Sequence, residues 1–332
     1  MMSNSDTLVT VLMPVYNAER YVSEAIESIL NQTYRDFEFI IINDGSTDQS
    51  EEIIQRYNDS RIVYVRNERN IRLVATLNKG IRMASGKYIM RMDADDISST
   101  DRMKLQVKFM ELHPDVGVCG SFLSVFGETI KPYLSRRPEN DEDIRSSMLV
   151  NNPLGHPNVI IRKSVLVKND IWYDENYYRM EDWGLWISLM PYCKFYNIQK
   201  PLLRYRYVET SESRLNSKDS KHLEISANLV QLFFDKIGVT CNASESKQIA
   251  ALIKSPHVFR LSKKEIRDSV LVLKTKLTTA EYMIPGLTEH TMERVTAFSL
   301  NKWYLMFLLI KKMGVNDYVR TAFSVLKKKN SR

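Results

Sequence analysis

The chain has 332 residues, of which 44% are hydrophobic and 26% are charged, as is typical of a globular protein. That length exceeds one average domain, so we expect either one large domain with an extension or two domains. Residues 301–332 hold eight Lys or Arg and one Asp, and eight minus one equals the whole formal net charge of +7. The rest of the chain is near neutral, which excludes a surface that coats nucleic acid.

In chain order, apolar runs and helical spacing predict a strand at 8–15, a helix at 18–30, a strand at 37–42, a helix at 51–57, a strand at 61–65, a helix at 73–84, a strand at 87–92, a helix at 101–112 and a strand at 116–121. Strands that alternate with helices indicate an α/β fold, with a mostly parallel sheet flanked by helices.

The pattern is less regular between about residues 115 and 210. Residues 152–166 look like a loop that runs into a strand, and residues 181–190 begin with two acids and continue with helical spacing. From about residue 215 the pattern is all helical. We therefore predict a first domain at 1–214 and a helical C-terminal region at 215–332.

Three cysteines without paired spacing favour a reducing compartment and no disulfide framework. The polar start MMSNSDTLVT predicts no signal peptide. The longest strongly apolar run, residues 303–310, is far shorter than the roughly 20 residues that span a bilayer. We expect a cytoplasmic protein.

The C-terminal tail combines WYLMFLLIKK with YVRTAFSVLKKK. Two interpretations stay open. One is an interfacial helix on the anionic inner face of the cytoplasmic membrane, which would suit a lipid-linked acceptor. The other is a helix packed on the core with a solvated basic end.

Polar or special residues follow several predicted strands at their carboxyl ends, where sheets of this class bind ligands. Pro14, Asp44 and Asp93 all occupy such positions. Their convergence is the strongest physical indication of a site in the chain.

Asp93, Asp95 and Asp96 stand together after a strand-like run, and three adjacent carboxylates repel each other. Residues 98–101 (SSTD) suffice to cap the following helix, so capping does not explain the acids. An EF-hand loop does not fit, because Ser98 and Lys104 stand where its Gly and bidentate Glu belong. The remaining interpretation is a hard divalent cation held by one or two carboxylates and substrate phosphates.

Three segments occur in a distinctive order: VLMPVYNAERYVSEAIESILNQTYRDFEFIIINDGSTD, then ASGKYIMRMDADD, then EDW. This set resembles the family-2 nucleotide-sugar glycosyltransferases, which have a Rossmann-like nucleotide-binding fold of the GT-A type. The resemblance covers roughly residues 8–208. Nothing beyond about residue 215 resembles the family.

The resemblance implies a donor site whose members are Pro14, Val15, Tyr16, Asn17, Glu19, Asp44, Arg72, Asp93, Ala94 and Asp95. Asp44 would accept a hydrogen bond from the base, usually uracil, and Asn43 replaces a second acid that members often carry. Arg72, at a position where many members have Gly, would approach the diphosphate. Asp93 would lie near the ribose, and Asp95 would ligate Mg²⁺ or Mn²⁺ with Asp93 beside it in the metal site.

The resemblance also implies that Asp182, in EDW, is the general base. One carboxylate acting on the face opposite the leaving group would invert the anomeric centre. Glu181 either raises the pKa of Asp182 by like-charge repulsion or stabilises the helix N-terminus. An acid pair that only stabilises a helix is the structural alternative for both residues.

Weaker candidates lie on the acceptor side. His156 would touch the diphosphate or the acceptor, or is a turn residue. Trp183 would stack on an acceptor sugar, whereas Trp186 and Cys119 are expected in the core.

The chain lacks the Q-x-x-R-W motif of processive synthases, so we expect transfer of one sugar per encounter. The predicted function is inverting, metal-dependent transfer from a nucleotide sugar, a UDP-sugar, to a glycan or glycolipid acceptor in bacterial surface polysaccharide biosynthesis. Two alternatives are a nucleotidyltransferase, which PVYNAER disfavours by lacking Gly, and a non-catalytic module that binds nucleotide sugars or glycans.

Overall fold

The computed structural model describes residues 9–209, 220–254, 262–281, 283–284, 286–289 and 291–292. The chain divides into two compact units. The first contains residues 1–141, 153–175 and 192–214, and the second contains 142–152, 176–191 and 215–332. Two short segments that precede residue 215 thus belong to the second unit. The basic tail at 301–332 lies outside the described residues.

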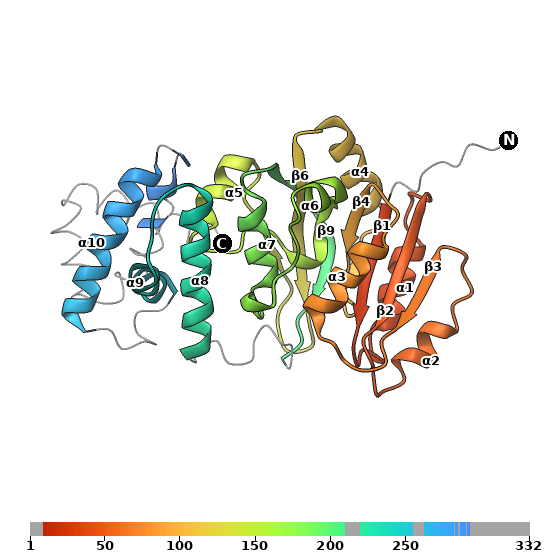
Figure 1. Cartoon of the computed structure of the whole chain (residues 1–332). Helices are drawn as coiled ribbons and strands as arrows, with labels where there is room; N and C mark the ends of the chain where they lie inside the picture. The colour runs from red at the N-terminus through yellow and green to blue at the C-terminus, as the bar shows by residue number, and fades with distance from the viewer. Residues whose placement is uncertain are drawn as a thin grey trace. The chain divides into compact units, whose positions relative to one another are not determined.

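A mixed sheet forms the first unit (Figure 1). Its strands among the described residues are β1 (Val9–Val15), β2 (Phe37–Asn43), β3 (Ile62–Arg66), β4 (Tyr88–Arg91), β5 (Ile97–Ser98), β6 (Val116–Phe126), β7 (Tyr133–Ser135), β8 (Ile160–Arg162) and β9 (Lys194–Arg206). The strand order is β3-β2-β1-β4-β8-β6-β9-β5, with β7 paired to β6. Strands β1 to β4 pair in parallel, as predicted, whereas β8 runs antiparallel to both β4 and β6.

The helices of this unit are α1 (Val22–Leu30), α2 (Ser50–Gln55), α3 (Leu73–Met83), α4 (Arg102–Leu112), α6 (Lys163–Lys168) and the 3₁₀ turn η1 (His156–Asn158). Helix α1 begins four residues later than the spacing predicts. Residues 18–21 form a turn instead, in which the N–H groups of Tyr21 and Val22 donate to the Ala18 carbonyl, while the N–H groups of Ala18 and Glu19 donate to the side chains of Ser50 and Asp48.

Alternate residues of β1 and β2 face opposite layers, because side chains of a strand alternate between its two faces. Val9, Val11 and Met13 share a buried cluster with Ala25 and Ile26 of α1. Helix α3 covers the other face, where Gly80 lets the helix approach Leu12 and Ile42 closely. Both faces of the parallel strands are therefore covered, as the continuous apolar runs predicted.

Helix α4 begins at Arg102, with Asp101 as its N-cap residue. The predicted side-chain cap is absent among the described residues, because the Asp101 carboxylate accepts a hydrogen bond from Thr33 Oγ1 at 2.8 Å instead. The capping interpretation of SSTD is therefore wrong in its contacts, although an acid does stand at this helix N-terminus.

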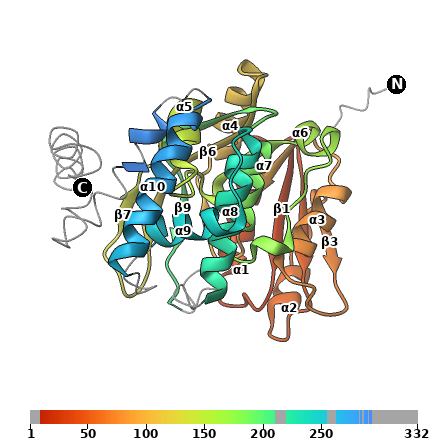
Figure 2. The ribbon, with the colours of Figure 1, turned by 60° about the vertical axis from the view of Figure 1, so that its left-hand side comes forward.

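The second unit is helical (Figure 2). It holds α7 (Glu181–Leu189), α8 (Ser220–Lys236), α9 (Ala243–Lys254), α10 (Lys263–Ala280) and residues 142–147 of α5 (Asp141–Ser147); the 3₁₀ turn η2 (Glu175–Tyr177) leads into α7. Helix α8 packs against α7 and α9, and α9 packs against α10. The helical pattern predicted after residue 215 is confirmed for the described residues. None of their helices combines the length and apolar character needed to cross a membrane.

Candidate active site

The carboxyl ends of β1, β2 and β4 meet at one edge of the sheet. Val15 pairs with Asn43 across β1 and β2, and Leu12 pairs with Arg91 across β1 and β4, all in parallel. The loops that follow these strands begin with Tyr16, Asp44 and Met92, and the last of them contains the aspartate cluster. The predicted convergence at this edge is confirmed.

The loop after β1 is locked to the loop after β2. Asn17 has a left-handed backbone (φ 48°), and its side-chain oxygen accepts the Thr47 N–H at 2.8 Å. The Glu19 carboxylate accepts the Gln49 N–H at 2.8 Å. Both side chains thus shape the loop, whereas Tyr16 is 49% exposed and leaves its ring open to a ligand.

Asp44 is buried and oriented by two donors. Its Oδ1 accepts hydrogen bonds from Asn67 Nδ2 at 2.8 Å and from the Ile71 N–H at 2.9 Å. Lys79 Nζ donates to Asn67 Oδ1 at 2.6 Å and thereby fixes the amide that holds Asp44. Among the described residues no donor contacts Oδ2, so this oxygen is available to a ligand.

Asn43, which stands where the resemblance places a second acid, has a structural role. Its Oδ1 accepts the Ser46 N–H and its Nδ2 donates to Tyr64 Oη. A carboxylate there could not donate the second of these bonds.

Arg72 precedes α3 in an unusual conformation. Its φ of 71° and ψ of 162° lie in a region that is essentially restricted to glycine. Its side chain is exposed, and its guanidinium has no ion-pair or hydrogen-bond partner among the described residues. The predicted diphosphate ligand is therefore a strained residue with a free cationic group.

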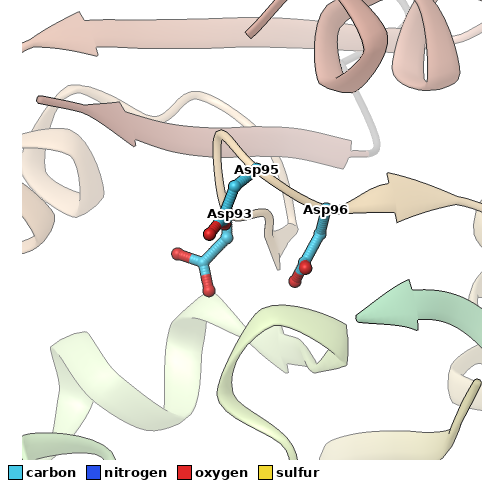
Figure 3. Close-up of side chains that lie close together, drawn as sticks. All are labelled: Asp93, Asp95 and Asp96. Carbon is cyan, nitrogen blue, oxygen red and sulfur yellow. The ribbon is translucent and has the colours of Figure 1, made fainter. Parts of the chain in front are cut away.

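Three carboxylates project to the same side of the loop between β4 and β5 (Figure 3). One oxygen each from Asp93, Asp95 and Asp96 lies within 4.8 Å of the others. Burial, and then the charge of Asp93, raises the pKa of Asp95 to about 6. Carboxylate oxygens this close together match the donor set that Mg²⁺ and Mn²⁺ prefer, and a cation would relieve their repulsion, so these residues fit such an ion.

Asp96, which had no assigned role, is fully buried beside this group. Its Oδ1 accepts the backbone N–H of Arg206 at 2.8 Å. Its Oδ2 is also buried and has no hydrogen-bond partner among the described residues. Burial and the charges of Asp93 and Asp95 raise the pKa of Asp96 well above its ordinary value.

Arg91, at the end of β4, forms an ion pair with Asp93. The guanidinium is buried, and burial lowers its pKa, but the Asp93 carboxylate outweighs burial and the net pKa is raised. Sequence patterns did not identify this residue, because an Arg within an apolar strand carries no functional signal until its partner is known.

His156 lies in η1 and is partly buried, and its Nε2 is 2.9 Å from Tyr173 Oη. Burial, and then the charge of Arg91, holds its pKa well below the usual value. Asn78 holds the backbone of Tyr173 by two hydrogen bonds. The histidine is thus a partly buried neutral group of the first unit whose ring contacts Tyr173, which favours a structural role over contact with an acceptor.

Asp182 belongs to the second unit, at the first turn of α7. Asn152 Nδ2 donates to its Oδ2 at 2.6 Å, and the Trp183 N–H donates to its Oδ1 at 2.8 Å. Trp183 is only 6% exposed, and its Nε1 donates to the Met148 carbonyl, which favours packing over stacking on a sugar. Glu181 is buried as well.

Trp186 and Cys119 are completely buried, so both core predictions are confirmed.

Solved structures of similar fold are glycosyltransferases. S. aureus TarS, residues 1–349 in complex with UDP-GlcNAc, has a TM-score of 0.58 at 18% identity, covering 97% of this chain and 92% of that one. The mannosyltransferase PcManGT from Pyrobaculum calidifontis, in complex with GDP-Man and Mn²⁺, has a TM-score of 0.51 at 15% identity, covering 97% and 87%. These similarities establish the fold, which is of the GT-A type.

Proteins of similar sequence are also named as glycosyltransferases. An uncharacterized glycosyltransferase of Methanocaldococcus jannaschii is 37% identical over 206 residues, which are 60% of this chain and 70% of that protein. Another from Haemophilus influenzae is 28% identical over 308 residues, or 89% and 94%. The amylovoran biosynthesis glycosyltransferase AmsE of Erwinia amylovora is 31% identical over 185 residues, or 54% and 69%.

The family model for glycosyl transferase family 2 matches residues 10–169, which include β2 to β4, the aspartate loop and all of β1 except Val9. Sequence, fold and the arrangement of this edge of the sheet agree, and the chain belongs to glycosyltransferase family 2.

Proposed function

We propose that the chain transfers one sugar from a UDP-sugar to a glycan or glycolipid acceptor, with inversion and with the aid of Mg²⁺ or Mn²⁺. The observation that carries this proposal is the carboxylate group of Asp93, Asp95 and Asp96 at the strand edge that Asp44 and Arg72 also border.

The donor base is selected by Asp44. A carboxylate only accepts hydrogen bonds, and its unoccupied Oδ2 suits the imide N–H of uracil. Cytosine has no proton on the equivalent ring nitrogen, so its lone pair would oppose the carboxylate. The exposed ring of Tyr16 supplies a face on which the base stacks.

The diphosphate is held by opposite charges. Asp93 and Asp95 would hold the cation, and the cation would supply Lewis-acid stabilisation of the leaving nucleoside diphosphate. The free guanidinium of Arg72 adds a charge-assisted hydrogen bond to a phosphate oxygen.

Asp182 accepts the proton of the acceptor hydroxyl. As the acceptor oxygen forms its bond to the anomeric carbon, the bond from that carbon to the diphosphate oxygen breaks, and its electron pair leaves with UDP. Attack opposite the leaving group inverts the anomeric configuration. The bond from Asn152 orients the carboxylate for this task.

The acceptor class rests on relatives. AmsE is named for amylovoran biosynthesis, which supports a role for this chain in building a bacterial surface polysaccharide such as an O-antigen or capsule. A lipid-linked acceptor at the inner face of the cytoplasmic membrane suits that role.

The test is release of nucleoside diphosphate by the full chain from a panel of UDP-, GDP- and CDP-sugars, with Mn²⁺, Mg²⁺ or EDTA. We expect UDP release that requires the cation and is lost in Asp95→Ala. Asp101→Asn, which removes a carboxylate that Thr33 alone of the described residues contacts through its side chain, serves as the matched control. Sugar 1-phosphate as the product would indicate a nucleotidyltransferase, because transfer of the nucleoside monophosphate leaves the second phosphate on the sugar. Donor binding without turnover would indicate a binding module.

A further inference from the structure

Arg206, the last residue of β9, contacts the aspartate loop from a distant part of the sequence. Strand β9 pairs antiparallel with β5, where Ile97 is opposite Arg204. The same antiparallel register, continued two residues forward along β9 and two residues before β5, places Arg206 opposite Asp95. The sheet thus brings an arginine to the loop that carries the proposed metal ligands.

Two hydrogen bonds join Arg206 to that loop. Its backbone N–H donates to Asp96 Oδ1, and its Nε–H donates to the Asp95 carbonyl oxygen, both at 2.8 Å. The first bond fixes the Asp96 carboxylate and the second fixes the main chain at Asp95, and both leave the carboxylates of Asp93 and Asp95 uncommitted to Arg206.

The guanidinium is itself anchored on all sides. Its terminal nitrogen forms an ion pair with Glu24 of α1. Its carbon lies 4.5 Å from the ring centre of Tyr21 and 4.6 Å from that of Phe126. With the side chain only 15% exposed, the planar group is held in one orientation, which a lysine could not reproduce.

We propose that Arg206 is a positioning residue for the metal loop, residues 93–96. The inference rests on the proposed function, because it concerns the carboxylates that would hold the cation. Neighbouring carboxylates repel each other and would spread apart in a free loop. Arg206 opposes this by tying the Asp95 carbonyl and the Asp96 carboxylate to β9 and, through Glu24, to α1, so that Asp93 and Asp95 stay close before a cation binds.

Binding of Mn²⁺ by the protein distinguishes this role from general stabilisation. The affinity is measured from the electron paramagnetic resonance signal of free Mn²⁺ at saturating UDP, together with the melting temperature of the metal-free protein. Partners that orient metal ligands typically change metal affinity about 10- to 100-fold when removed. We expect Arg206→Met to lower the Mn²⁺ affinity by that factor, and Arg206→Lys to lower it by a smaller factor.

The matched control is Arg204→Met. Arg204 lies two residues earlier on β9 and also stacks on Phe126, at 4.4 Å, but it makes no hydrogen bond to residues 93–96. We expect its Mn²⁺ affinity to stay within about twofold of the affinity of the wild-type chain. If Arg206→Met does not fold, Glu24→Gln tests the same anchor, because it loosens the guanidinium from α1 and should weaken Mn²⁺ binding several-fold.

The outcomes separate the two proposals. The positioning role is overturned if Arg206→Met leaves the Mn²⁺ affinity unchanged, even if the melting temperature falls. It is also overturned if Arg206→Lys and Glu24→Gln both leave that affinity unchanged. Absence of Mn²⁺ binding by the unchanged chain and by Arg204→Met overturns the metal dependence itself.

Discussion

Because the backbone of Arg72 is strained, we predict that replacing this residue with glycine both stabilises the fold and weakens binding at the donor site. A non-glycine residue at φ 71° and ψ 162° costs on the order of 1–3 kcal/mol. Glycine removes that strain but adds about 0.5–1 kcal/mol of unfolded-chain entropy. Taking about 2 and about 0.7 kcal/mol as midpoints, Arg72→Gly should raise the free energy of unfolding by about 1 kcal/mol.

Arg72→Ala separates strain from side-chain loss. Alanine lacks the guanidinium but keeps the strained backbone, and because the arginine side chain is exposed its removal should change stability by less than about 0.5 kcal/mol. Urea unfolding of the three proteins, followed by circular dichroism, measures these differences. A Gly variant that is less stable than the Ala variant by about 0.5–1 kcal/mol, the entropy cost of glycine alone, would show that position 72 stores no strain.

Both variants remove the proposed phosphate contact. A charge-assisted hydrogen bond contributes about 1.5–3 kcal/mol, so the dissociation constant for UDP with Mn²⁺ should rise roughly 10- to 100-fold in each. Calorimetric titration with UDP measures it, with uridine as the ligand control, because uridine has no phosphate and should bind all three proteins equally. UDP affinity that survives in both variants would refute the diphosphate role of Arg72.

Four further substitutions test other parts of the molecule. Asp95→Asn should weaken Mn²⁺ binding at least about tenfold in the resonance assay, unlike Asp101→Asn. Asp182→Asn should lower kcat by about 10²- to 10⁴-fold in a transfer assay without changing UDP affinity, and a normal kcat would exclude it as the base. Gly80→Ala would place a methyl group 2.2 Å from a leucine carbon of β1 and should cost about 1–3 kcal/mol in urea unfolding; unchanged stability would contradict that packing. The pKa of His156 is held well below its usual value by burial, so the unfolded chain binds its proton first as pH falls. The free energy of unfolding should therefore drop by about 1 kcal/mol more in the unchanged chain than in His156→Gln between about pH 7 and pH 5.5, and parallel profiles would refute this.

Local patterns predicted the parts of the fold that local forces determine. The apolar runs of β1 to β4 and the helical spacing of α1, α3 and α4 follow from burial of one strand face or one helix stripe, and they needed no tertiary information. The predicted helix start at residue 18 was four residues early, because residues 18–21 form a turn whose N–H groups at Ala18 and Glu19 donate to Ser50 and Asp48, contacts distant in sequence that the local pattern does not show. Strand β9 was missed because its apolar residues do not alternate regularly.

The residues of the site likewise differ in whether the local sequence pattern predicts them. Asp44 and Asp93 were predictable because each follows a strand, and parallel strands bring such positions together whatever their neighbours are. Arg91 and Arg206 were not, because their significance is the partner that each meets across the sheet. An arginine on an isolated strand looks like a surface residue, yet both are largely buried against the aspartate loop.

This difference has a physical reason. In a loop whose carboxylates lie close together before a cation binds, other groups must oppose the repulsion between them. Those groups have to contact the loop from neighbouring elements. Residues on the loop itself cannot do so, since they move with it. The holding groups must therefore come from other elements of the sheet: Arg91 beside Asp93 from β4, and Arg206 behind Asp95 and Asp96 from β9. A D-x-D motif read alone shows which groups would bind the ion, whereas the strand order β1-β4-β8-β6-β9-β5 determines which residues keep those groups together.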